Sequence, residues 1–497
     1  MSAVREAPAP GAPSRRGEVA AALSRVLGEG GVLVEREELK PYECDGLSAY
    51  RATPLVATIP ASEADVAAVL EVARGTNTPV VARGSGTGLS GGALPLADGI
   101  LLSLAKFNRI VAVDSLARRA RVQPGVTNLR ISQEVAPHGL YYAPDPSSQI
   151  ACSIGGNVAE NSGGVHCLKY GLTVHNIAKV RALTIEGDTV DLGSDALDAA
   201  GYDLLALVTG SEGLLAITLE VTVKLLPKPE LAQVVMASFP SAESAGQAVA
   251  SVIGAGIVPA GLEMMDQLAT SAVEGFVHAG YDLEAEAILL AESDGSREEV
   301  AHEIEKIIEV MRASGATQIR CSSSDAERLR FWSGRKAAFP AVGRISPDYY
   351  CIDGSIPRAA LASVLKRIGE LSARYGLRCA NVFHAGDGNL HPLILYDANI
   401  PGELETTERF ACDILEMCVE VGGTITGEHG VGIEKINQMC TQFAVPELAQ
   451  FHAVKAAFDP QGLLNPGKGV PTLHRCAEYG AMRVKAGALP HPDLPRF

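Results

Sequence analysis

The sequence predicts an α+β protein with two principal domains. Its 497 residues exceed what one hydrophobic core usually organises, so two or three domains are expected. Apolar residues make up 47% and charged residues 20% of the chain, as in ordinary globular proteins. Strand-like and helix-like stretches alternate, and the pattern changes at Lys228-Pro229, which we interpret as a domain boundary.

Charge and hydropathy exclude two classes of protein. A net charge of -16 leaves no basic stripe to neutralise phosphates, which argues against a nucleic-acid partner. No apolar run reaches the length of a transmembrane helix. Residues 1–16 lack the apolar core of a signal peptide and predict a disordered tail. Together these features predict a cytoplasmic protein.

Ten cysteines are spread along the chain without a C-x-x-C motif. Iron–sulfur or zinc-ribbon ligation within the chain is therefore not expected, and reduced, mostly buried thiols are. Any one-electron chemistry would need a cluster supplied by a partner.

The first half of the chain begins with a predicted unit of strand, helix and strand. An apolar strand at 54–60 is fenced by prolines, and Ser62 caps a helix that runs to about Thr76 with acids in its first turn. A strand at 78–83 completes the unit. The other expected elements are helices at 17–29 and 127–138 and strands at 99–104, 109–114, 119–123, 177–186 and 214–226.

Beyond Lys228 the pattern predicts an antiparallel sheet covered by helices on one face. The expected strands are 233–239, 286–292, 316–321, 349–355, 378–384 and 389–396. The expected helices are 241–254, 296–314, 324–338, 357–375, 401–422 and 447–458.

Two glycine-rich tracts punctuate the first half. In the first, Arg83 to Gly92, Gly86-x-Gly88-x-x-Gly91 matches the dinucleotide fingerprint, but no helix follows at once, so we reject a Rossmann site. The absence of a following Gly-Lys-Ser/Thr excludes a P-loop. What remains is a loop that binds phosphate through its backbone amides. A merely flexible loop is the alternative, and the second tract, residues 152–164, argues against it.

A third feature is the stretch from His384 to His391, followed by Glu428 and His429. The two ends of a tight turn return close together, so both imidazoles of the stretch can meet one ion. Glu428 lies in a glycine-flanked loop that can approach them. Two histidines and a carboxylate leave coordination positions open, as a catalytic metal site requires. A coincidental grouping is the alternative.

These motifs together resemble a known family. Arg83 to Gly92, Ser153-Ile-Gly-Gly-Asn157 and Gly210-Ser-Glu-Gly213 resemble the FAD-binding half of flavoproteins of the vanillyl-alcohol-oxidase type. His384 to His391 and Glu428-His429-Gly430 resemble the D-2-hydroxyacid dehydrogenase branch. The tracts Phe331 to Pro340 and Asn465 to Lys468 are similar to the FAD-linked subunits of bacterial glycolate oxidases.

The resemblance implies a division of the chain. Residues 17–227 would form a two-lobed FAD-binding domain, with lobes at about 17–110 and 111–227, and residues 228–425 an α/β cap domain with an antiparallel sheet. Residues 426–470 would return to the FAD, and a tail at 471–497 would pack on the cap or on a partner subunit.

The resemblance also implies the residues that bind FAD. They share the glycine tracts and their surroundings: Arg83, Gly84, Ser85, Gly86, Thr87, Gly88, Leu89, Ser90, Gly91, Pro144, Asp145, Ser153, Gly155, Gly156, Asn157, Asn161, Ser162, Gly163, Gly164, Gly210, Glu212, Gly213, Ile217 and Asn465. Positions 84–92 hold no His or Cys, so we expect non-covalent FAD.

For the reaction, the resemblance implies a divalent metal, zinc or manganese, on His384, His391 and Glu428. The metal would chelate the carboxylate and 2-hydroxyl of the substrate. His429 would remove the hydroxyl proton as hydride leaves C2 for flavin N5; a fourth ligand or a loop-shaping residue is its alternative role.

Arg335 is expected to clamp the substrate carboxylate from a helix that faces the site, with a surface arginine as the alternative. Lys336 is expected to point elsewhere, and Asn389 and Tyr350 to line the pocket or to be structural. Relatives that act on dicarboxylic acids carry further polar residues after the arginine, where this chain has Phe339 and Cys351. This departure favours a small monocarboxylate.

The expected activity is FAD- and metal-dependent oxidation of a small D-2-hydroxy acid, with glycolate to glyoxylate first. The chain would be the catalytic subunit of a complex with an iron–sulfur subunit and a second FAD-type subunit, reaching the inner face of the membrane only through partners. A stand-alone D-lactate dehydrogenase is the alternative. A non-catalytic flavin electron-transfer subunit is a third, against which the complete histidine set argues.

Overall fold

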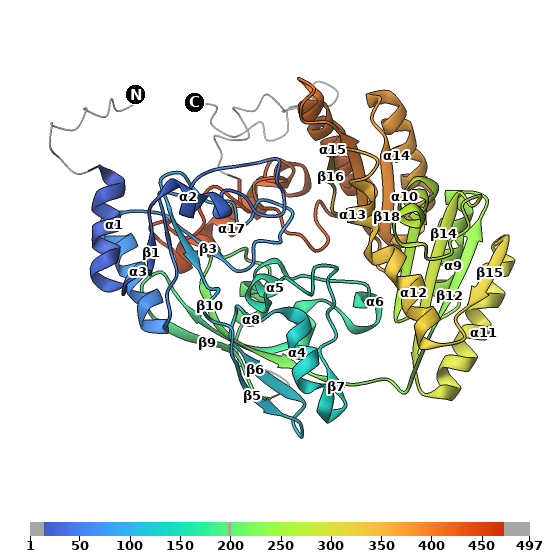
Figure 1. The fold of residues 1–497 in the computed structure, drawn as a ribbon, viewed down its shortest axis with the longest axis horizontal. Helices are drawn as coiled ribbons and strands as arrows, with labels where there is room; N and C mark the ends of the chain where they lie inside the picture. Colours follow the sequence, from blue (N-terminus) through green and yellow to red (C-terminus); the bar gives the residue numbers. More distant parts are fainter. Residues whose placement is uncertain (1–13, 197–199, 472–497) are drawn as a thin grey trace.

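The protein, described by a computed structural model over residues 14–196 and 200–471, has two halves that lie side by side (Figure 1). The N-terminal half holds a four-stranded and a five-stranded sheet, and the C-terminal half holds one large sheet. The predicted α+β class is confirmed. Most of both predicted tails lies outside the described residues.

The first sheet has the strand order β1-β2-β4-β3. Strands β2 and β3 each pair in parallel with β4, and β1 is antiparallel to β2. The predicted strand–helix–strand unit is therefore present, but β4 lies between its two strands. The elements are α1 (Arg15–Val26), β1 (Val32–Leu33), α2 (Arg36–Leu39), η1 (Lys40–Tyr42), β2 (Val56–Thr58), α3 (Glu63–Thr76), β3 (Val80–Arg83) and β4 (Ile100–Ser103).

Helix α3 begins where the capping pattern predicts. The Ser62 hydroxyl accepts a hydrogen bond from the Asp65 amide at 3.2 Å, and the Asp65 carboxylate accepts one from the Ser62 amide at 3.1 Å. This reciprocal pair satisfies amides that have no partner within the first helical turn. The face of α3 that packs on the sheet buries Val66, Val69 and Leu70.

The second sheet is antiparallel, in the order β5-β6-β10-β8-β9. Strand β9 was not predicted, because its Thr-Val-Asp-Leu-Gly sequence is half polar and it forms an edge that buries little. The elements of this region are β5 (Ile110–Asp114), β6 (Arg119–Val122), α4 (Asn128–Val135), η2 (Ala136–His138), β7 (Leu140–Tyr141), α5 (Ile154–Glu160), α6 (Cys167–Tyr170), α7 (Thr173–Asn176), β8 (Ile177–Leu183), β9 (Thr189–Gly193), α8 (Leu204–Val208), β10 (Ile217–Lys224) and β11 (Leu226–Pro227).

The C-terminal half is built on one eight-stranded antiparallel sheet, ordered β15-β12-β14-β13-β18-β19-β16 with β17 paired to β19. Its strands are β12 (Leu231–Phe239), β13 (Gly261–Asp266), β14 (Ala287–Gly295), β15 (Gln318–Cys321), β16 (Asp348–Cys351), β17 (Gly354–Ser355), β18 (Cys379–His384) and β19 (Asn389–Tyr396). Its helices are α9 (Ala242–Gly254), α10 (Gln267–Val277), α11 (Arg297–Ala313), α12 (Asp325–Lys336), α13 (Ala338–Val342), η3 (Arg358–Ala360), α14 (Leu361–Tyr375) and α15 (Glu403–Glu420).

Helices cover both faces of this sheet, so the expectation of one covered face is wrong. Val235 and Phe239 of β12 face a core shared with α9, α11, α14 and α15. Val234 and Met236 face a second core, shared with α10, α12 and α13. Strands buried on both faces are apolar at nearly every position rather than at alternate ones. The unpredicted pair β13 and α10 is part of this second layer.

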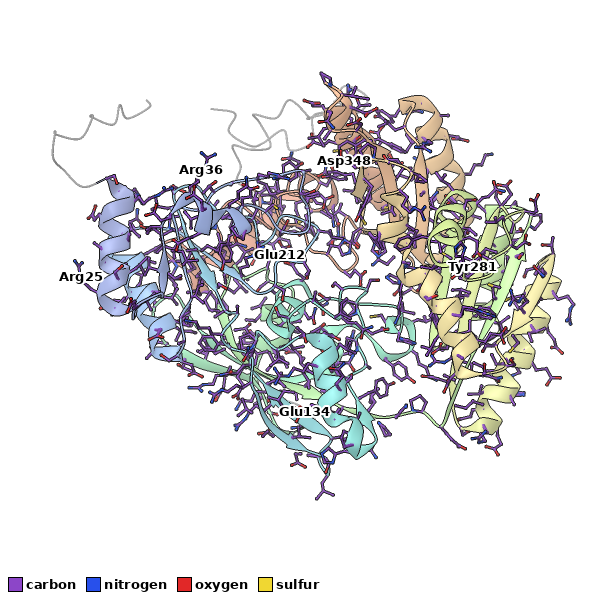
Figure 2. All side chains as sticks on the ribbon, in the orientation of Figure 1. Arg25, Arg36, Glu134, Glu212, Tyr281 and Asp348 are labelled. Atoms are coloured by element: carbon purple, nitrogen blue, oxygen red, sulfur yellow. The ribbon has the colours of Figure 1, made fainter. Side chains whose placement is uncertain are left out.

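The chain finally returns to the N-terminal half through α16 (Met439–Gln442) and α17 (Val445–Phe458), as Figure 1 shows for α17. The Val80 amide donates to the Leu463 carbonyl, and the Asn465 amide donates to the Val80 carbonyl, each at 2.8 Å. The Glu212 carboxylate, labelled near the middle of Figure 2, accepts hydrogen bonds from the Val431 and Gly432 amides. The C-terminal segment thus joins the two halves.

Two further expectations concern cysteines and membranes. Among the residues that the structure describes, eight cysteines are free thiols: Cys44, Cys152, Cys167, Cys321, Cys351, Cys379, Cys412 and Cys418. Cys440 is disulfide-bonded, so the expectation of reduced thiols is wrong at that position. Within residues 14–196 and 200–471, none of the helices has the length and apolar content needed to cross a membrane.

Replacing Asn465 with Ala is predicted to destabilise the fold. Asn465 has a φ of 44°, and its buried side chain donates to the carbonyls of Gly92 and Glu212 at 3.0 and 2.7 Å. The exposed Asn77, with a φ of 47°, is a matched control for the backbone strain alone. Denaturant unfolding should show a loss for Asn465→Ala that exceeds the loss for Asn77→Ala by about 1–3 kcal/mol. Equal losses would contradict the proposed role of the two hydrogen bonds.

Candidate active site

A cavity of about 480 Å³ runs from the two glycine tracts to the histidine cluster. Residues 82–89 and 211–213 line it from the N-terminal half. Its far end is lined by His391, Glu428 and His429. One continuous space therefore connects the predicted phosphate-binding loops with the predicted metal site.

The glycine tracts face each other across a narrow gap. A side chain at Gly84 would collide with the Ser153 hydroxyl, and one at Gly155 would lie 2.5 Å from Cβ of Pro124. The Ser153 Oγ is buried and has no hydrogen-bond partner among the described residues. A cradle without side chains, with an unsatisfied hydroxyl in it, suits a ligand that brings its own hydrogen-bonding oxygens.

Many of the predicted cofactor residues lie on the cavity wall: Arg83, Gly84, Ser85, Gly86, Thr87, Gly88, Leu89, Ser153, Gly155, Gly156, Asn157, Ser162, Glu212, Gly213 and Ile217. The wall, as the described residues form it, does not include Ser90, Gly91, Pro144, Asp145, Asn161, Gly163, Gly164, Gly210 or Asn465. Cofactor contacts by this second group stay a prediction.

Some residues of the second group have other partners. The Asp145 carboxylate lies 2.9 Å from Nδ1 of His166, whose Nε2 lies 3.2 Å from Glu292 of the opposite half. The Pro144 carbonyl accepts a hydrogen bond from Asn128. Asn465 ties the C-terminal segment to the N-terminal half rather than pointing into the cavity.

Sequence reasoning missed several lining residues, among them Pro124 and the run Pro146-Ser147-Ser148. The run directly follows the predicted Pro144 and Asp145, so the stretch was recognised but these three members of it were not named as cofactor residues. Pro124 carried no signal, because only the folded chain brings it against Gly155.

The predicted metal residues come together around one oxygen. Glu428 Oε1 lies 3.3 Å from Nε2 of His384 and 3.0 Å from Nε2 of His391. His384 ends β18 and His391 lies on β19, and the two strands pair across the turn as expected. Ligand atoms of the three side chains all lie within 4.8 Å of one another, so they could hold one ion.

Charge in this cluster is shared between carboxylates and imidazoles. Burial opposes ionisation of Glu428, but the charge of His384 and hydrogen bonds to both histidines hold its pKa well below the usual value. Burial likewise opposes a charged His384, but Glu263 and Glu428 raise its pKa well above the usual value. Surroundings that stabilise a proton there also suit a metal cation in its place.

His429 lies beside this cluster, with its Nε2 3.7 Å from Glu428 Oε1. Its ring stacks on that of His391, with centroids 5.0 Å apart and planes 10° apart. Burial, helped by the charge of His391 and opposed by Asp353, lowers the pKa of His429 to about 4. The imidazole is therefore neutral and has a lone pair that can accept a proton, but the lowered pKa makes it a weaker base than a free imidazole.

Asp353 shapes the loop that carries Glu428 and His429. Its carboxylate accepts hydrogen bonds from the amides of Gly427, Glu428 and His429 at 2.9–3.1 Å. Lys435 Nζ lies 2.9 Å from Asp353 Oδ2, and both side chains are fully buried. Burial raises the pKa of Asp353, but Lys435 and the histidines outweigh it and lower the pKa. No motif predicted this residue.

Arg335 lies deep in the C-terminal half, 1% exposed, rather than on the cavity wall. Its Nε donates to Glu263 Oε2 at 2.7 Å, while Glu263 Oε1 lies 2.7 Å from Nδ1 of His384. The Glu263 carboxylate thus links the Arg335 guanidinium to His384 of the predicted metal set. Its Nη1 and Nη2 are buried without a partner among the described residues, and two free parallel donors suit a carboxylate. Glu263 was missed because β13 was missed.

The structure agrees to different degrees with the positions predicted for Lys336, Tyr350 and Asn389. Lys336 lines the cavity, so the expectation that it points elsewhere is wrong. Tyr350 is 3% exposed and packs in the first core of the C-terminal sheet, away from the cavity wall. Asn389 packs against Gly427 of the loop that carries Glu428 and His429, which indicates a structural position. Substrate contact by either of the last two stays a prediction.

Comparisons with known proteins agree with this geometry. Residues 54–193 match the family model "FAD binding domain", and residues 228–469 match "FAD linked oxidases, C-terminal domain". The chain is 63% identical to glycolate oxidase subunit GlcD of Escherichia coli, over 94% of this chain and 93% of that protein. The chain belongs to the family of FAD-linked oxidases.

Other relatives of this FAD-linked oxidase support the same assignment. It is 37% identical to GlcD of Bacillus subtilis, over 86% of this chain and 91% of that protein. It is 32% identical to D-lactate dehydrogenase of Archaeoglobus fulgidus, over 83% of this chain and 91% of that protein. The predicted resemblance is confirmed.

Solved structures show the same fold at low sequence identity. p-Cresol methylhydroxylase superposes with a TM-score of 0.77 at 16% identity, over 92% of this chain and 97% of that one. 4-Ethylphenol oxidase of Gulosibacter chungangensis gives 0.76 at 17% identity, over 93% and 98%. The predicted vanillyl-alcohol-oxidase-type fold is confirmed. FAD is the cofactor that this fold and the matched domain imply.

The residues present fit FAD. The cradle at Gly84 and Gly155, the unsatisfied Ser153 hydroxyl and the Arg83 guanidinium on the cavity wall together suit a pyrophosphate. Residues 84–92 contain no nucleophilic His or Cys that could attach the cofactor.

Proposed function

We propose that this chain is an FAD- and metal-dependent dehydrogenase of small D-2-hydroxy acids, with glycolate oxidised to glyoxylate as the first candidate reaction. The observation that carries the proposal is the single cavity lined both by the glycine tracts and by His391, Glu428 and His429. A cofactor and a polar reaction centre share that space.

The relatives support both the substrate class and an assembly. Two are named as a subunit of glycolate oxidase, and one of these is 63% identical to this chain. We propose that this chain is likewise the catalytic subunit of a complex that includes an iron–sulfur subunit and a second FAD-type subunit. The free-standing alternative is supported by the relative named D-lactate dehydrogenase, which is 32% identical.

The chain's own residues divide the chemical tasks. Non-covalent FAD, held by the glycine tracts, supplies the acceptor for the hydride that leaves C2 of the substrate. His384, His391 and Glu428 would hold a zinc or manganese ion, which supplies Lewis acidity toward the carboxylate and the 2-hydroxyl. The ligand atoms, two nitrogens and an oxygen, suit either metal.

His429 accepts the 2-hydroxyl proton. Its neutral imidazole borders the cavity next to the three metal residues, and the Asp353 carboxylate holds its backbone in place. Removing this proton as hydride departs turns the alcohol carbon into a carbonyl, so two electrons and two protons are accounted for.

Arg335, which lies behind the cavity wall, is the proposed clamp for the substrate carboxylate. Glu263 accepts a hydrogen bond from Nε of Arg335. The two terminal nitrogens have no partner among the described residues, so they can form a bidentate pair with the substrate carboxylate. The aromatic ring of Phe339 on the cavity wall leaves little room or polarity for a second carboxylate, which favours a small monocarboxylate.

Replacing His429 is predicted to abolish flavin reduction. Anaerobic mixing with glycolate or D-lactate, but not with L-lactate, should bleach the flavin absorbance of the wild-type protein. His429→Gln should retain bound FAD and slow bleaching by about 10²–10⁴-fold, because a general base contributes on that order. His302→Gln, on the exposed face of α11, is the control. Wild-type rates in His429→Gln would refute the base, and a chain without flavin absorbance would refute the proposal as a whole.

Metal removal and restoration are predicted to distinguish residues that bind the metal from residues that do not. Chelation should stop hydroxy-acid-dependent bleaching of the wild-type protein, and Zn²⁺ or Mn²⁺ should restore it. His384→Ala should bind less metal by elemental analysis and should not recover, because two ligands hold an ion more weakly than three. Full recovery of His384→Ala would exclude His384 as a ligand.

Arg335 and Lys336 are adjacent cations, and a substitution at each tests which of them binds the substrate carboxylate. Arg335→Lys should raise the apparent Kd for glycolate by about ten- to a hundredfold, since it loses a charged, bidentate hydrogen-bonded pair. Lys336→Gln, a change on the exposed cavity wall, should shift it far less. The apparent Kd of each variant is measured from the bleaching rate as a function of glycolate concentration. The reverse ranking would assign the clamp to Lys336.

A further inference from the structure

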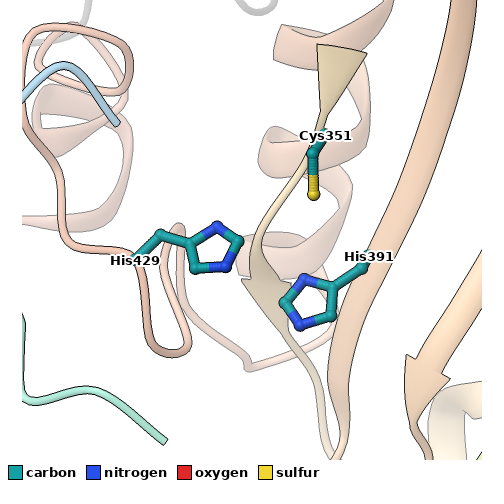
Figure 3. A group of neighbouring side chains, drawn as sticks. All are labelled: Cys351, His391 and His429. Carbon is teal, nitrogen blue, oxygen red and sulfur yellow. The ribbon is translucent and has the colours of Figure 1, made fainter. Parts of the chain in front are cut away.

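A second set of metal-ligating side chains overlaps the first. Cys351, His391 and His429 also bring one ligand atom each to within 4.8 Å of the others. Figure 3 shows the thiol and the two imidazoles converging on one space from three different segments. Neither the proposed reaction nor the predicted metal set gives Cys351 a role as a ligand.

The sheet explains why Cys351 reaches His391. Cys351 ends β16 and is paired with Leu393 of β19, and both pack in the second core of the sheet. His391 lies two residues before Leu393, so it shares that face. Diagonal neighbours on one face of an antiparallel pair are close enough for side chains to meet.

His429 completes the set from the catalytic loop. Its Nδ1 is buried and has no hydrogen-bond partner among the residues that the structure describes. His391 Nδ1 lies 3.4 Å from the Ile352 carbonyl, at the limit of a weak contact. Cys351 is a free thiol and only 5% exposed. The Cys351 thiol lies 3.6 Å from the same Ile352 carbonyl, also a weak contact. The three side chains therefore face one another, and only weak contacts to one carbonyl compete for Cys351 Sγ and His391 Nδ1.

Donor chemistry distinguishes the two sets. Two imidazoles with a carboxylate suit manganese as well as zinc, whereas two imidazoles with a thiolate select thiophilic cations. His391 belongs to both sets, and a neutral imidazole offers one lone pair. An ion on one set therefore withdraws His391 from the other, so the two positions are alternatives.

We propose that Cys351, His391 and His429 form a second, thiolate-containing position for a thiophilic divalent cation of the zinc group. The binding itself requires only these three side chains. Its consequence rests on the proposed function: an ion bound there takes the proposed base His429 and the proposed ligand His391 out of catalysis, which makes the position inhibitory.

Cadmium alone is the probe, added to the FAD-loaded protein after chelation. We expect a saturable ultraviolet charge-transfer band from a cadmium–thiolate bond, which Cys351→Ser removes. Cys418→Ser, which removes another buried free thiol, is the matched control and should keep the band. A wild-type protein without the band, or an undiminished band in Cys351→Ser, would overturn the proposal. Flavin absorbance reports that each variant is folded.

Two further variants keep the outcome decisive. His429→Gln should weaken cadmium binding at least about tenfold, roughly the 1.4 kcal/mol equivalent of one weakened ligand. His384→Ala, outside the set, should keep the band, and Mn²⁺ should compete with Cd²⁺ in the wild-type protein but not in His384→Ala. Unchanged binding in His429→Gln would overturn the three-residue site.

Inhibition is measured separately from binding. Each variant's bleaching rate with glycolate is normalised to its own rate without cadmium, and Cys351→Ser should need at least about tenfold more Cd²⁺ for half inhibition. Equal sensitivity would overturn the inhibitory role. If no 2-hydroxy acid bleaches the flavin, the proposed function fails, whereas the cadmium band still reports on the site.

Discussion

The buried pair of Asp353 and Lys435 holds the reaction centre in shape. The Asp353 carboxylate accepts hydrogen bonds from three successive amides of the loop at 427–429, and Lys435 neutralises it while also donating to the Gly430 carbonyl. Removing one partner of such a pair leaves a buried charge unbalanced, which typically costs about 3–5 kcal/mol. Glu428 and His429 therefore hold their positions because a buried charge that accepts hydrogen bonds from their own amides requires the loop to keep its form.

A second constraint comes from the way the chain closes on itself. Glu212, beside the second glycine tract, accepts the Val431 and Gly432 amides, and Asn465 bonds back to Gly92. The same short segment thus carries the proposed base and touches the proposed cofactor loops. The shared imidazole of His391 adds a choice between two donor sets to the same small volume.

The local sequence predicted the features that a short stretch of residues is enough to define. The glycine tracts, the turn between His384 and His391, and the capped helix α3 were all recognisable from residue type and spacing. The residues that support them were not. Glu263 escaped notice because its strand is short and follows no polar alternation, and Asp353 because a lone buried acid has no pattern. The covering of both sheet faces by helices was likewise missed, since strands that are apolar at every position show no alternation that would mark a second buried face.

By itself the sequence determined a phosphate-binding loop and a set of candidate metal ligands, because glycine spacing and paired histidines limit the chemistry wherever they lie. The two-lobed fold and FAD as the cofactor followed from the resemblance of its motifs to a known family. The tertiary structure decided which of these residues meet. It placed Lys336 on the cavity wall and Arg335 behind it on Glu263, although the two are adjacent in the chain. It also brought Cys351 to the histidines through strand pairing. Contacts between distant segments depend on register and packing, which no local pattern encodes.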